Sequence, residues 1–181
     1  DRDRLQIIYP FPERMTVCGD TRYDQVYRRG TAALEREQKP LFADSGHPVL
    51  IARSIWPSDE RHLMPAVIEL MKKYPDLDVV LVPHEPVEEH LAGLQSTLKE
   101  AGYDSVRYTA IEAGAENTSR AVIVDTVGVL AGLYAQADIA YVGGSFGPGV
   151  HNVMEPAILG IPVLFGPKHL NSLEARELDE R

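Results

Sequence analysis

Short apolar runs alternate along the chain with longer segments of mixed polarity. The apolar runs include VLIA from Val49, VVLV from Val79 and VIV from Val122. Such runs are typical of strands that helices cover on both faces, as in a parallel sheet. We predict strands over Met15–Cys18, Val49–Ser54, Leu77–Val82, Ser105–Thr109, Ala121–Val124, Ile139–Val142 and Pro162–Phe165.

The longer segments carry the signals of helices. We predict helices over Tyr23–Gln38, Pro57–Tyr74, Val87–Ala101, Val127–Ala137 and Asn152–Leu159. The second of them begins with Pro57, Asp59 and Glu60 and ends with Lys72 and Lys73. Acidic residues at the start and basic residues at the end complement the helix dipole, which favours a helix here.

Strands and helices alternate at the spacing of βαβ units. This alternation predicts an α/β protein with a Rossmann-like doubly wound parallel sheet. Residues 112–119 (EAGAENTS) are small and polar and indicate a loop, whereas residues 1–12 indicate a chain end or a connector. Ligands of such sheets bind beyond the carboxyl ends of the strands. The segments to inspect for chemistry therefore follow Ser54, Val82, Val124, Val142 and Phe165.

Size and charge narrow the classes of function. The 181 residues suit one domain, and 18 basic against 27 acidic residues give a net charge of −9. This charge argues against nucleic acid as a partner, because phosphate neutralisation needs a basic surface. Cys18 is the only cysteine, so an internal disulfide cannot form. No apolar run reaches the roughly 20 residues of a membrane-spanning helix. The chain begins without methionine and stops at Arg181 within a helical pattern, so we expect a single domain cut from a longer protein.

The strongest candidate site lies between residues 141 and 166 (YVGGSFGPGVHNVMEPAILGIPVLFG). A predicted strand ends in glycines, and a flexible loop leads to a helix that we expect to open near residue 151. Glycines let the backbone approach a ligand closely, and a helix start offers donors to an anion. Glu155 would face the same opening and could accept two hydrogen bonds from the hydroxyl pair of a sugar. From this region we assign Gly144, Ser145, His151, Asn152 and Glu155 to the site.

Three known functional motifs also depend on glycines of this kind. These glycines do not form G-x-G-x-x-G, and no G-K-[ST] is present, which argues against a dinucleotide site and a phosphate-binding P-loop. GGSFG does fit the G-x-S-x-G elbow of α/β-hydrolases, with Ser145 as the nucleophile. FGPG starts a helix poorly, and only Glu155 and His169 could complete a triad. A serine hydrolase stays an alternative.

Three further segments follow predicted strands. Arg53 and Ser54 precede a helix start and could reach a phosphate or a carboxylate, although a serine here could also simply cap the helix. Prolines on both sides of the His84 turn aim its imidazole outward. Thr126 could cap the following helix, while Gly128 would let a nucleobase lie against the helix start. The six histidines show no metal-ligand spacing, so we predict no bound metal.

Taken together, these segments resemble a known family. The motifs are GDTRYDQ from Gly19, S-x-W-P-x-D-E from Ser54, the Pro-His-Glu-Pro turn, DTVGVLAGLYAQADIAYVGGSF from Asp125, HNVMEPA from His151 and GIPVLFGP from Gly160. In this order they resemble the 3-deoxy-D-manno-octulosonic acid (Kdo) transferases over nearly the whole chain. The resemblance implies the C-terminal, donor-binding half of a GT-B glycosyltransferase, with the N-terminal acceptor domain and the last C-terminal helices outside residues 1–181.

The resemblance also implies an activity. Such enzymes are inverting, metal-independent transferases of lipopolysaccharide biosynthesis that need no cofactor. They use CMP-Kdo as donor and a lipid A precursor as acceptor, at the cytoplasmic face of the bacterial inner membrane. The catalytic base and the membrane contact are expected in the N-terminal domain, so we expect this chain alone to be inactive. By resemblance the donor lies against Arg53, Ser54, His84, Thr126, Gly128, Gly144, Ser145, His151, Asn152 and Glu155.

The sequence departs from the family pattern in two places. Many members carry glycine at the position of Arg53, where a cation either clashes with the donor or pairs with its phosphate or carboxylate. After Gly166 and Pro167 the match is loose, because Ser172 replaces an aromatic residue. A GT-B donor domain for a UDP-sugar and a domain that only binds or regulates stay as alternatives.

Overall fold

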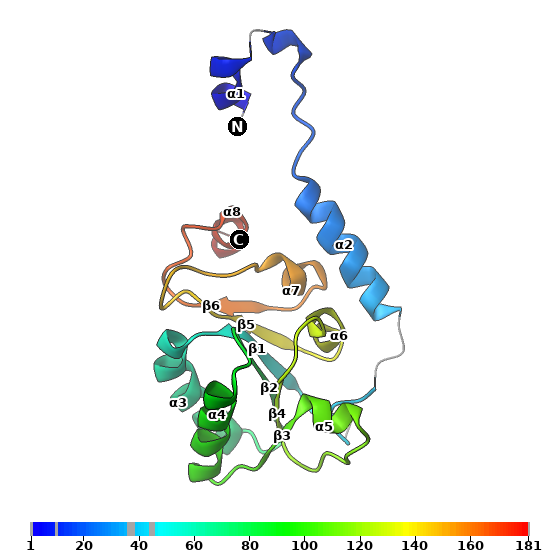
Figure 1. Cartoon of the computed structure of the whole chain (residues 1–181), viewed down its shortest axis with the longest axis vertical. Coiled ribbons are helices and arrows are strands. Elements are labelled where there is room, and N and C mark those ends of the chain that lie inside the picture. Colours follow the sequence, from blue (N-terminus) through cyan, green and yellow to red (C-terminus); the bar gives the residue numbers. More distant parts are fainter. Residues whose placement is uncertain (1, 10, 36–38, 44–45, 181) are drawn as a thin grey trace.

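A computed structural model describes residues 2–9, 11–35, 39–43 and 46–180. Within this part of the chain the strands form one all-parallel sheet in the order β3-β4-β2-β1-β5-β6 (Figure 1). The strands are β1 (Val49–Ile55), β2 (Asp78–Pro83), β3 (Ser105–Arg107), β4 (Ala121–Ile123), β5 (Ile139–Val142) and β6 (Val163–Phe165). The predicted Rossmann-like doubly wound sheet is confirmed.

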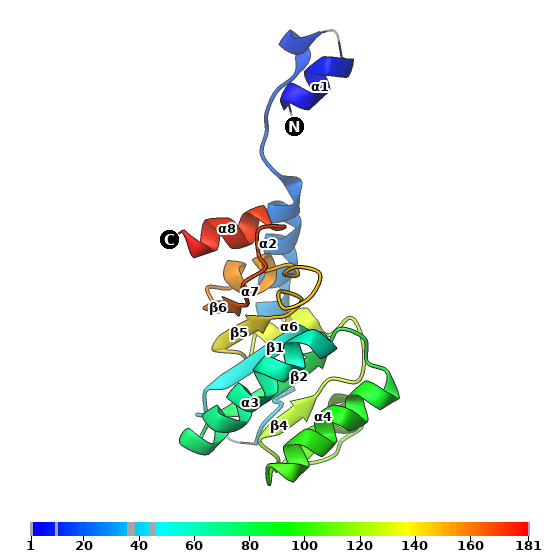
Figure 2. The same cartoon turned by 90° about the vertical axis from the view of Figure 1, so that its left-hand side faces the viewer.

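Helices cover both faces of the sheet. The helices of the described residues are α1 (Arg2–Ile8), the short 3-10 helix η1 (Pro12–Arg14), α2 (Thr21–Leu34), α3 (Pro57–Lys73), α4 (Glu88–Glu100), α5 (Tyr108–Glu112), α6 (Leu130–Tyr134), α7 (Met154–Ile158) and α8 (Leu173–Asp179), of which α1 and η1 do not contact the sheet. Figure 2 shows α3 and α4 in front of the sheet, and Figure 1 shows α5 and α6 on its other side. None of the described helices has the length and apolar composition that crossing a bilayer requires.

The two-sided cover explains why the central strands contain continuous apolar runs instead of alternating apolar and polar residues. In β1, Leu50 and Ala52 pack with α3 and α4, whereas Ile51 packs with α5 and α6 on the opposite face. Neighbouring side chains of a strand point to opposite faces, so a strand between two helical layers has no solvent-facing side. The exposed fraction of Ile51 and Ala52 is 0%.

The N-terminal part differs from the prediction. Met15–Cys18 form no strand but an extended connector, in which Val17 is 72% exposed. Asp20 ends this connector by capping α2, because its carboxylate accepts a hydrogen bond from the backbone N–H of Arg22 at 2.9 Å. The connector and α1 project away from the sheet (Figure 1), and a helix over residues 2–8 was not expected. The predicted end of the following helix, residues 36–38, lies outside the described residues.

Two helices near the site are shorter than predicted. Gly128 has a φ of +86°, which a right-handed helix cannot contain, so α6 begins only at Leu130. Asn152 stands before α7, and its side-chain oxygen accepts from the backbone N–H of Met154 at 2.9 Å. Helix α7 therefore begins at Met154 rather than near residue 151, which is a correction. Similarly, β3 ends at Arg107 because α5 begins with the next residue.

Candidate functional site

The sheet changes its winding direction at β1. From this central strand the chain adds β2 on one side and β5 on the other, and crevices beyond the carboxyl ends at such a point are the usual ligand sites of doubly wound sheets. The backbone is unusual here. Ser54 has a φ of +50°, and the pairing of β1 with β2 shifts register between Arg53 and Ile55. A Cβ on Gly143 would lie only 2.2 Å from the carbonyl oxygen of Ser54, so glycine is required after β5.

A cavity of about 270 Å³ opens beyond these strand ends. Its walls include six of the ten predicted donor-binding residues: Arg53, Ser54, His84, Thr126, Gly128 and His151. These residues come from the ends of β1 and β2 and from the loops after β4 and β5. The remaining wall is mainly valine, proline and leucine, and no carboxylate lines the cavity. The lining is therefore basic and apolar, although the chain has a net charge of −9.

Arg53 connects two further predicted residues to the cavity. Its Nη1 donates a hydrogen bond to the backbone oxygen of Asn152 at 2.8 Å and lies 3.8 Å from Oε2 of Glu155. The carboxylate of Glu155 is thus paired with a cation. The side chain of Arg53 is 14% exposed and that of Glu155 31%, so both retain access to solvent.

The glycine loop after β5 is fixed by a buried carboxylate. Asp59, in the first turn of α3, is 0% exposed. One of its oxygens accepts from the N–H of Gly144 at 2.8 Å and from the N–H of Trp56 at 3.0 Å, and the other accepts from the N–H of Phe146 at 3.3 Å and the hydroxyl of Tyr141 at 3.1 Å. This contact places Gly144 beside the cavity, where a Cβ would lie 2.6 Å from the ring of His151.

Sequence reasoning missed this role of Asp59. The residue was assigned only to the helix dipole, because three of the four groups that it binds lie more than 80 residues later in the sequence. The only local signal is its position three residues after the N-cap, which suits a capping carboxylate.

Ser145 does not point into the cavity. It is 0% exposed, and its hydroxyl accepts a hydrogen bond from the N–H of Gly166 at 2.6 Å, which joins the glycine loop to the end of β6. No helix follows it directly, because α7 begins at Met154. A nucleophile elbow needs an exposed serine on a strand-to-helix turn. The geometry therefore contradicts Ser145 as a nucleophile, and as a side-chain contact to a ligand it is also misplaced.

Three rings meet between α3 and the cavity. The ring of His84 stacks on that of Trp56, with centroids 3.9 Å apart and planes at 18°, and lies 4.7 Å from the ring of His151. The indole N–H of Trp56 donates to Nε2 of His151 at 2.9 Å, which requires that nitrogen to be unprotonated. Burial lowers the pKa of His151, and His84 and Arg53 lower it further. The histidine is therefore held neutral. Sequence reasoning left Trp56 as a packing residue and missed this hydrogen bond.

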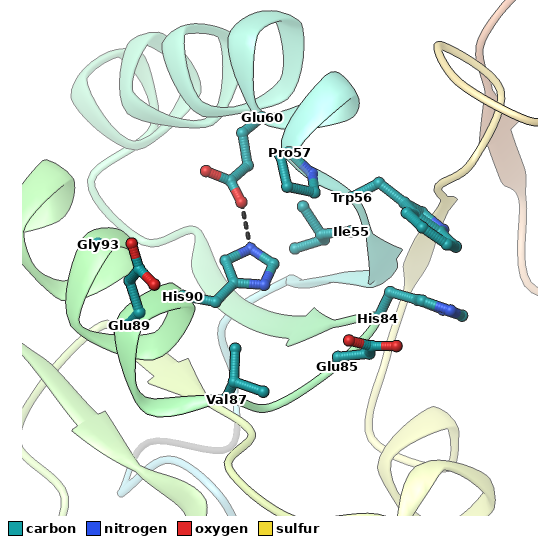
Figure 3. Close-up of a pocket in the computed structure, with 10 residues that line it drawn as sticks. All are labelled: Ile55, Trp56, Pro57, Glu60, His84, Glu85, Val87, Glu89, His90 and Gly93. Carbon is teal, nitrogen blue, oxygen red and sulfur yellow. Dashed lines mark hydrogen bonds and ion pairs between the residues drawn. The ribbon is translucent and has the colours of Figure 1, made fainter.

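A second cavity, of about 500 Å³, lies on the other side of His84 between α3 and α4 (Figure 3). His84 and Trp56 line it on one side, and an ion pair between Glu60 and His90 bridges the two helices above it. Ile55 and Val87 are among its apolar residues. Three glutamates line this cavity, so its lining is acidic, whereas the lining of the first cavity contains no carboxylate.

Among the residues that the structure describes, no three His, Cys, Asp or Glu side chains gather as metal ligands would. The absence of a metal from the reaction stays a prediction.

The fold matches that of a solved structure. The chain superposes on the crystal structure of the C-terminal CMP-Kdo binding domain of WaaA from Acinetobacter baumannii with a TM-score of 0.62 and 20% identity, over 86% of this chain and 75% of that one. The fold is that of the Rossmann-like C-terminal half of a GT-B glycosyltransferase.

Sequence comparison identifies relatives of this chain among known proteins. No family model matches the chain. The 3-deoxy-D-manno-octulosonic acid transferase of Haemophilus influenzae is 29% identical over 164 residues, which are 90% of this chain and 37% of the relative. The same transferase from Chlamydophila psittaci is 34% identical over 139 residues, which are 76% of this chain and 30% of the relative.

In sequence, the chain is a relative of the Kdo transferases, and the resemblance predicted from its motifs is confirmed. It spans about a third of the length of these relatives.

Proposed function

We propose that residues 1–181 form the donor-binding domain of a Kdo transferase and bind CMP-Kdo. One observation carries the proposal: the cavity at the reversal point of the sheet contains Arg53, His84 and His151 and no carboxylate, within a chain of net charge −9. A nucleotide-linked Kdo carries a phosphodiester and a carboxylate. The guanidinium of Arg53, a cation in an apolar wall, and the neighbouring imidazole rings favour such an anion far more than the net charge of the chain does.

The remaining predicted residues complete a donor site in this proposal. Glu155 lies beside Arg53, where its carboxylate can accept hydrogen bonds from a sugar or ribose hydroxyl. Thr126 and Gly128 lie on the wall near α6, where we place the cytosine. Gly144 and Asn152 contribute through the backbone beside the ring of His151 and the guanidinium of Arg53.

We further propose that the chain acts as part of a longer enzyme. Kdo transfer needs a base to activate the acceptor hydroxyl and donors to stabilise the departing phosphate. The cavity supplies the second set of groups. We place the base and the lipid A precursor in an N-terminal domain, and the reaction at the cytoplasmic face of the bacterial inner membrane, with inversion at the transferred carbon and without a metal.

Calorimetry with CMP tests the donor assignment. We expect binding that is lost when Glu155 is replaced by alanine and kept when Glu69, an exposed residue of α3 far from the cavity, is replaced by glutamine. Competition between CMP and UDP separates a CMP-sugar site from the alternative UDP-sugar site. A folded chain that binds neither nucleotide would contradict the donor assignment.

Two other functions have their own tests. A serine hydrolase would be labelled at Ser145 by a fluorophosphonate, and we expect no labelling because the hydroxyl is buried and bonded to Gly166. A domain that only binds or regulates would give no Kdo transfer even when it is joined to an acceptor domain. Transfer of Kdo to a lipid A precursor by the joined protein is the result we expect.

A further inference from the structure

One hydrogen bond at the edge of the first cavity fixes which nitrogen of a histidine carries its proton. The indole nitrogen of Trp56 lies 2.9 Å from Nε2 of His151, and the two ring centroids are 5.8 Å apart. An indole N–H can only donate, so Nε2 is the accepting, unprotonated nitrogen. Turning the imidazole over would place a carbon there, and the indole would lose its acceptor. A neutral imidazole carries one proton, so that of His151 lies on Nδ1.

Trp56 is itself held in place on two sides. Its indole stacks on the ring of His84, with centroids 3.9 Å apart (Figure 3), and its backbone N–H donates to the carboxylate of Asp59 at 3.0 Å. The same carboxylate accepts from the N–H of Gly144. One buried group therefore positions both the indole and the loop that leads to His151, so the hydrogen bond between the two rings is built into the fold.

The Nδ1 edge of His151 is the edge that remains for a ligand. Nε2 faces Trp56, and Cδ2 lies where a Cβ on Gly144 would approach to 2.6 Å. The ring lines the first cavity together with Arg53. Among the described residues Nδ1 has no hydrogen-bond partner, and it is not one of the buried side-chain atoms that lack one, so it reaches solvent. A free N–H donor thus lies at the cavity beside a guanidinium.

The position of this proton decides what the ring can do for an anion. With the proton on Nδ1 the ring donates to an anionic oxygen, whereas the other neutral tautomer would present a lone pair and repel it. A charged ring is not an easy alternative. Burial lowers the pKa of His151, the charges of His84 and Arg53 lower it further, and only Asp59 acts in the opposite direction. Without the indole, both neutral tautomers would be open to the ring.

We propose that Trp56 is a positioning residue that holds His151 in the Nδ1–H tautomer, and that this N–H donates to a phosphate oxygen of the bound nucleotide. This inference rests on the proposed nucleotide site. Arg53 supplies the positive charge and His151 a directed donor, so recognition of the phosphate does not depend on protonating the histidine. The tautomer is a property of the chain without any ligand, so it is measured separately from binding.

NMR tests the tautomer. Two-bond nitrogen–proton correlation spectra distinguish a protonated from an unprotonated ring nitrogen, and His151→Asn identifies the signals of His151 by their loss. Above the ordinary histidine pKa of about 6.5, we expect the proton on Nδ1. Trp56→Phe keeps an aromatic ring beside His84 but removes the indole N–H, and it should give a mixture of the two tautomers. Tyr74→Phe, which removes a ring hydroxyl at the half-exposed C-cap of α3, is the matched control and should leave His151 unchanged.

Titration with CMP and with cytidine, which has no phosphate, tests the contact. For Trp56→Phe we expect an affinity for CMP about fivefold lower, as for the loss of one hydrogen bond, and an unchanged affinity for cytidine. Tyr74→Phe should change neither. His151→Asn leaves no Nε2 for the indole to bind, so in this background Trp56→Phe should have no further effect on the affinity for CMP.

The outcomes separate this inference from the proposed function. If CMP does not bind the unaltered chain, the proposed function is contradicted, and the phosphate contact is contradicted with it. If CMP binds but His151 of the unaltered chain carries its proton on Nε2 or on both nitrogens, only the positioning role of Trp56 is overturned. That role is also overturned if Trp56→Phe leaves both affinities unchanged, lowers them equally, or has its full effect in the His151→Asn background.

Discussion

Asp59 should be the principal anchor of the site, and its replacement by asparagine tests this. The carboxylate accepts four hydrogen bonds, two on each oxygen, from the backbone of Trp56, Gly144 and Phe146 and from the hydroxyl of Tyr141. Asparagine has the same shape, but its NH₂ group is a donor. The favoured orientation places this NH₂ group toward Phe146 and Tyr141, because the hydroxyl of Tyr141 can rotate to accept from it, so that one buried donor, the N–H of Phe146, loses its acceptor.

The magnitude follows from these contacts. A buried donor left without an acceptor costs about 1–3 kcal/mol, so the loss at Phe146 reduces the free energy of unfolding by about 2 kcal/mol. For a chain of 181 residues, about 1 kcal/mol lowers the Tm by about 2–4 °C, which gives a decrease of about 4–8 °C. Because the lost contact fixes Phe146 in the glycine loop, the affinity for CMP should decrease as well.

Thermal unfolding followed by circular dichroism measures this effect. Glu69→Gln is the matched control, since it makes the same change of carboxylate to amide at an exposed position of the same helix. If Asp59→Asn lowered the Tm by no more than this control does, the carboxylate would not be what holds the glycine loop, and its role as the anchor of the site would be refuted.

Two further predictions concern backbone and protonation. Gly143→Ala should destabilise the chain by about 3 kcal/mol, because the new Cβ would lie 2.2 Å from a backbone oxygen. Gly93→Ala, inside α4, should stabilise the chain by up to about 1 kcal/mol, because its Cβ would meet nothing within 4 Å. Urea unfolding measures both variants, and equal effects on the free energy of unfolding would show that the close backbone contact at Gly143 is not decisive. The pKa of His151 is lowered in the folded chain, so between that pKa and the ordinary value near 6.5 the unfolded chain binds more protons, and stability should fall as the pH is lowered through this window. His151→Gln should flatten that part of the stability profile, and an unchanged slope would show that His151 is not its source.

The sheet was predictable because each strand is marked by an apolar run within its own segment of the sequence. Apolar runs such as those at Val49 and Val79 indicate buried strands by themselves, since nearly all of their residues are buried between helical layers. The false strand at Met15–Cys18 had a similar short apolar pattern but no neighbouring strand to pair with. A strand needs a partner as well as a suitable composition, and the partner is not visible in the segment itself.

The site was predictable only in part, for the same reason. Glycines and strand ends identified the rim of the sheet, and six of the ten residues assigned there line one cavity. Asp59 was missed because the glycine loop that it holds is distant in sequence. Ser145 was misjudged because a serine in a glycine loop has no local feature that distinguishes a bond to Gly166 from a bond to a ligand.

His84 has a consequence for the shape of whatever occupies this rim. Its imidazole separates the first cavity, which contains Arg53, from the second, which three glutamates line, and it stacks on the ring of Trp56. A molecule that extended from one cavity into the other would have to pass this ring. Its end in the first cavity would have to be negative, and its end in the second cavity neutral or positive. Replacing His84 by alanine would join the two cavities into one groove and remove this selection for a ligand with one negative end.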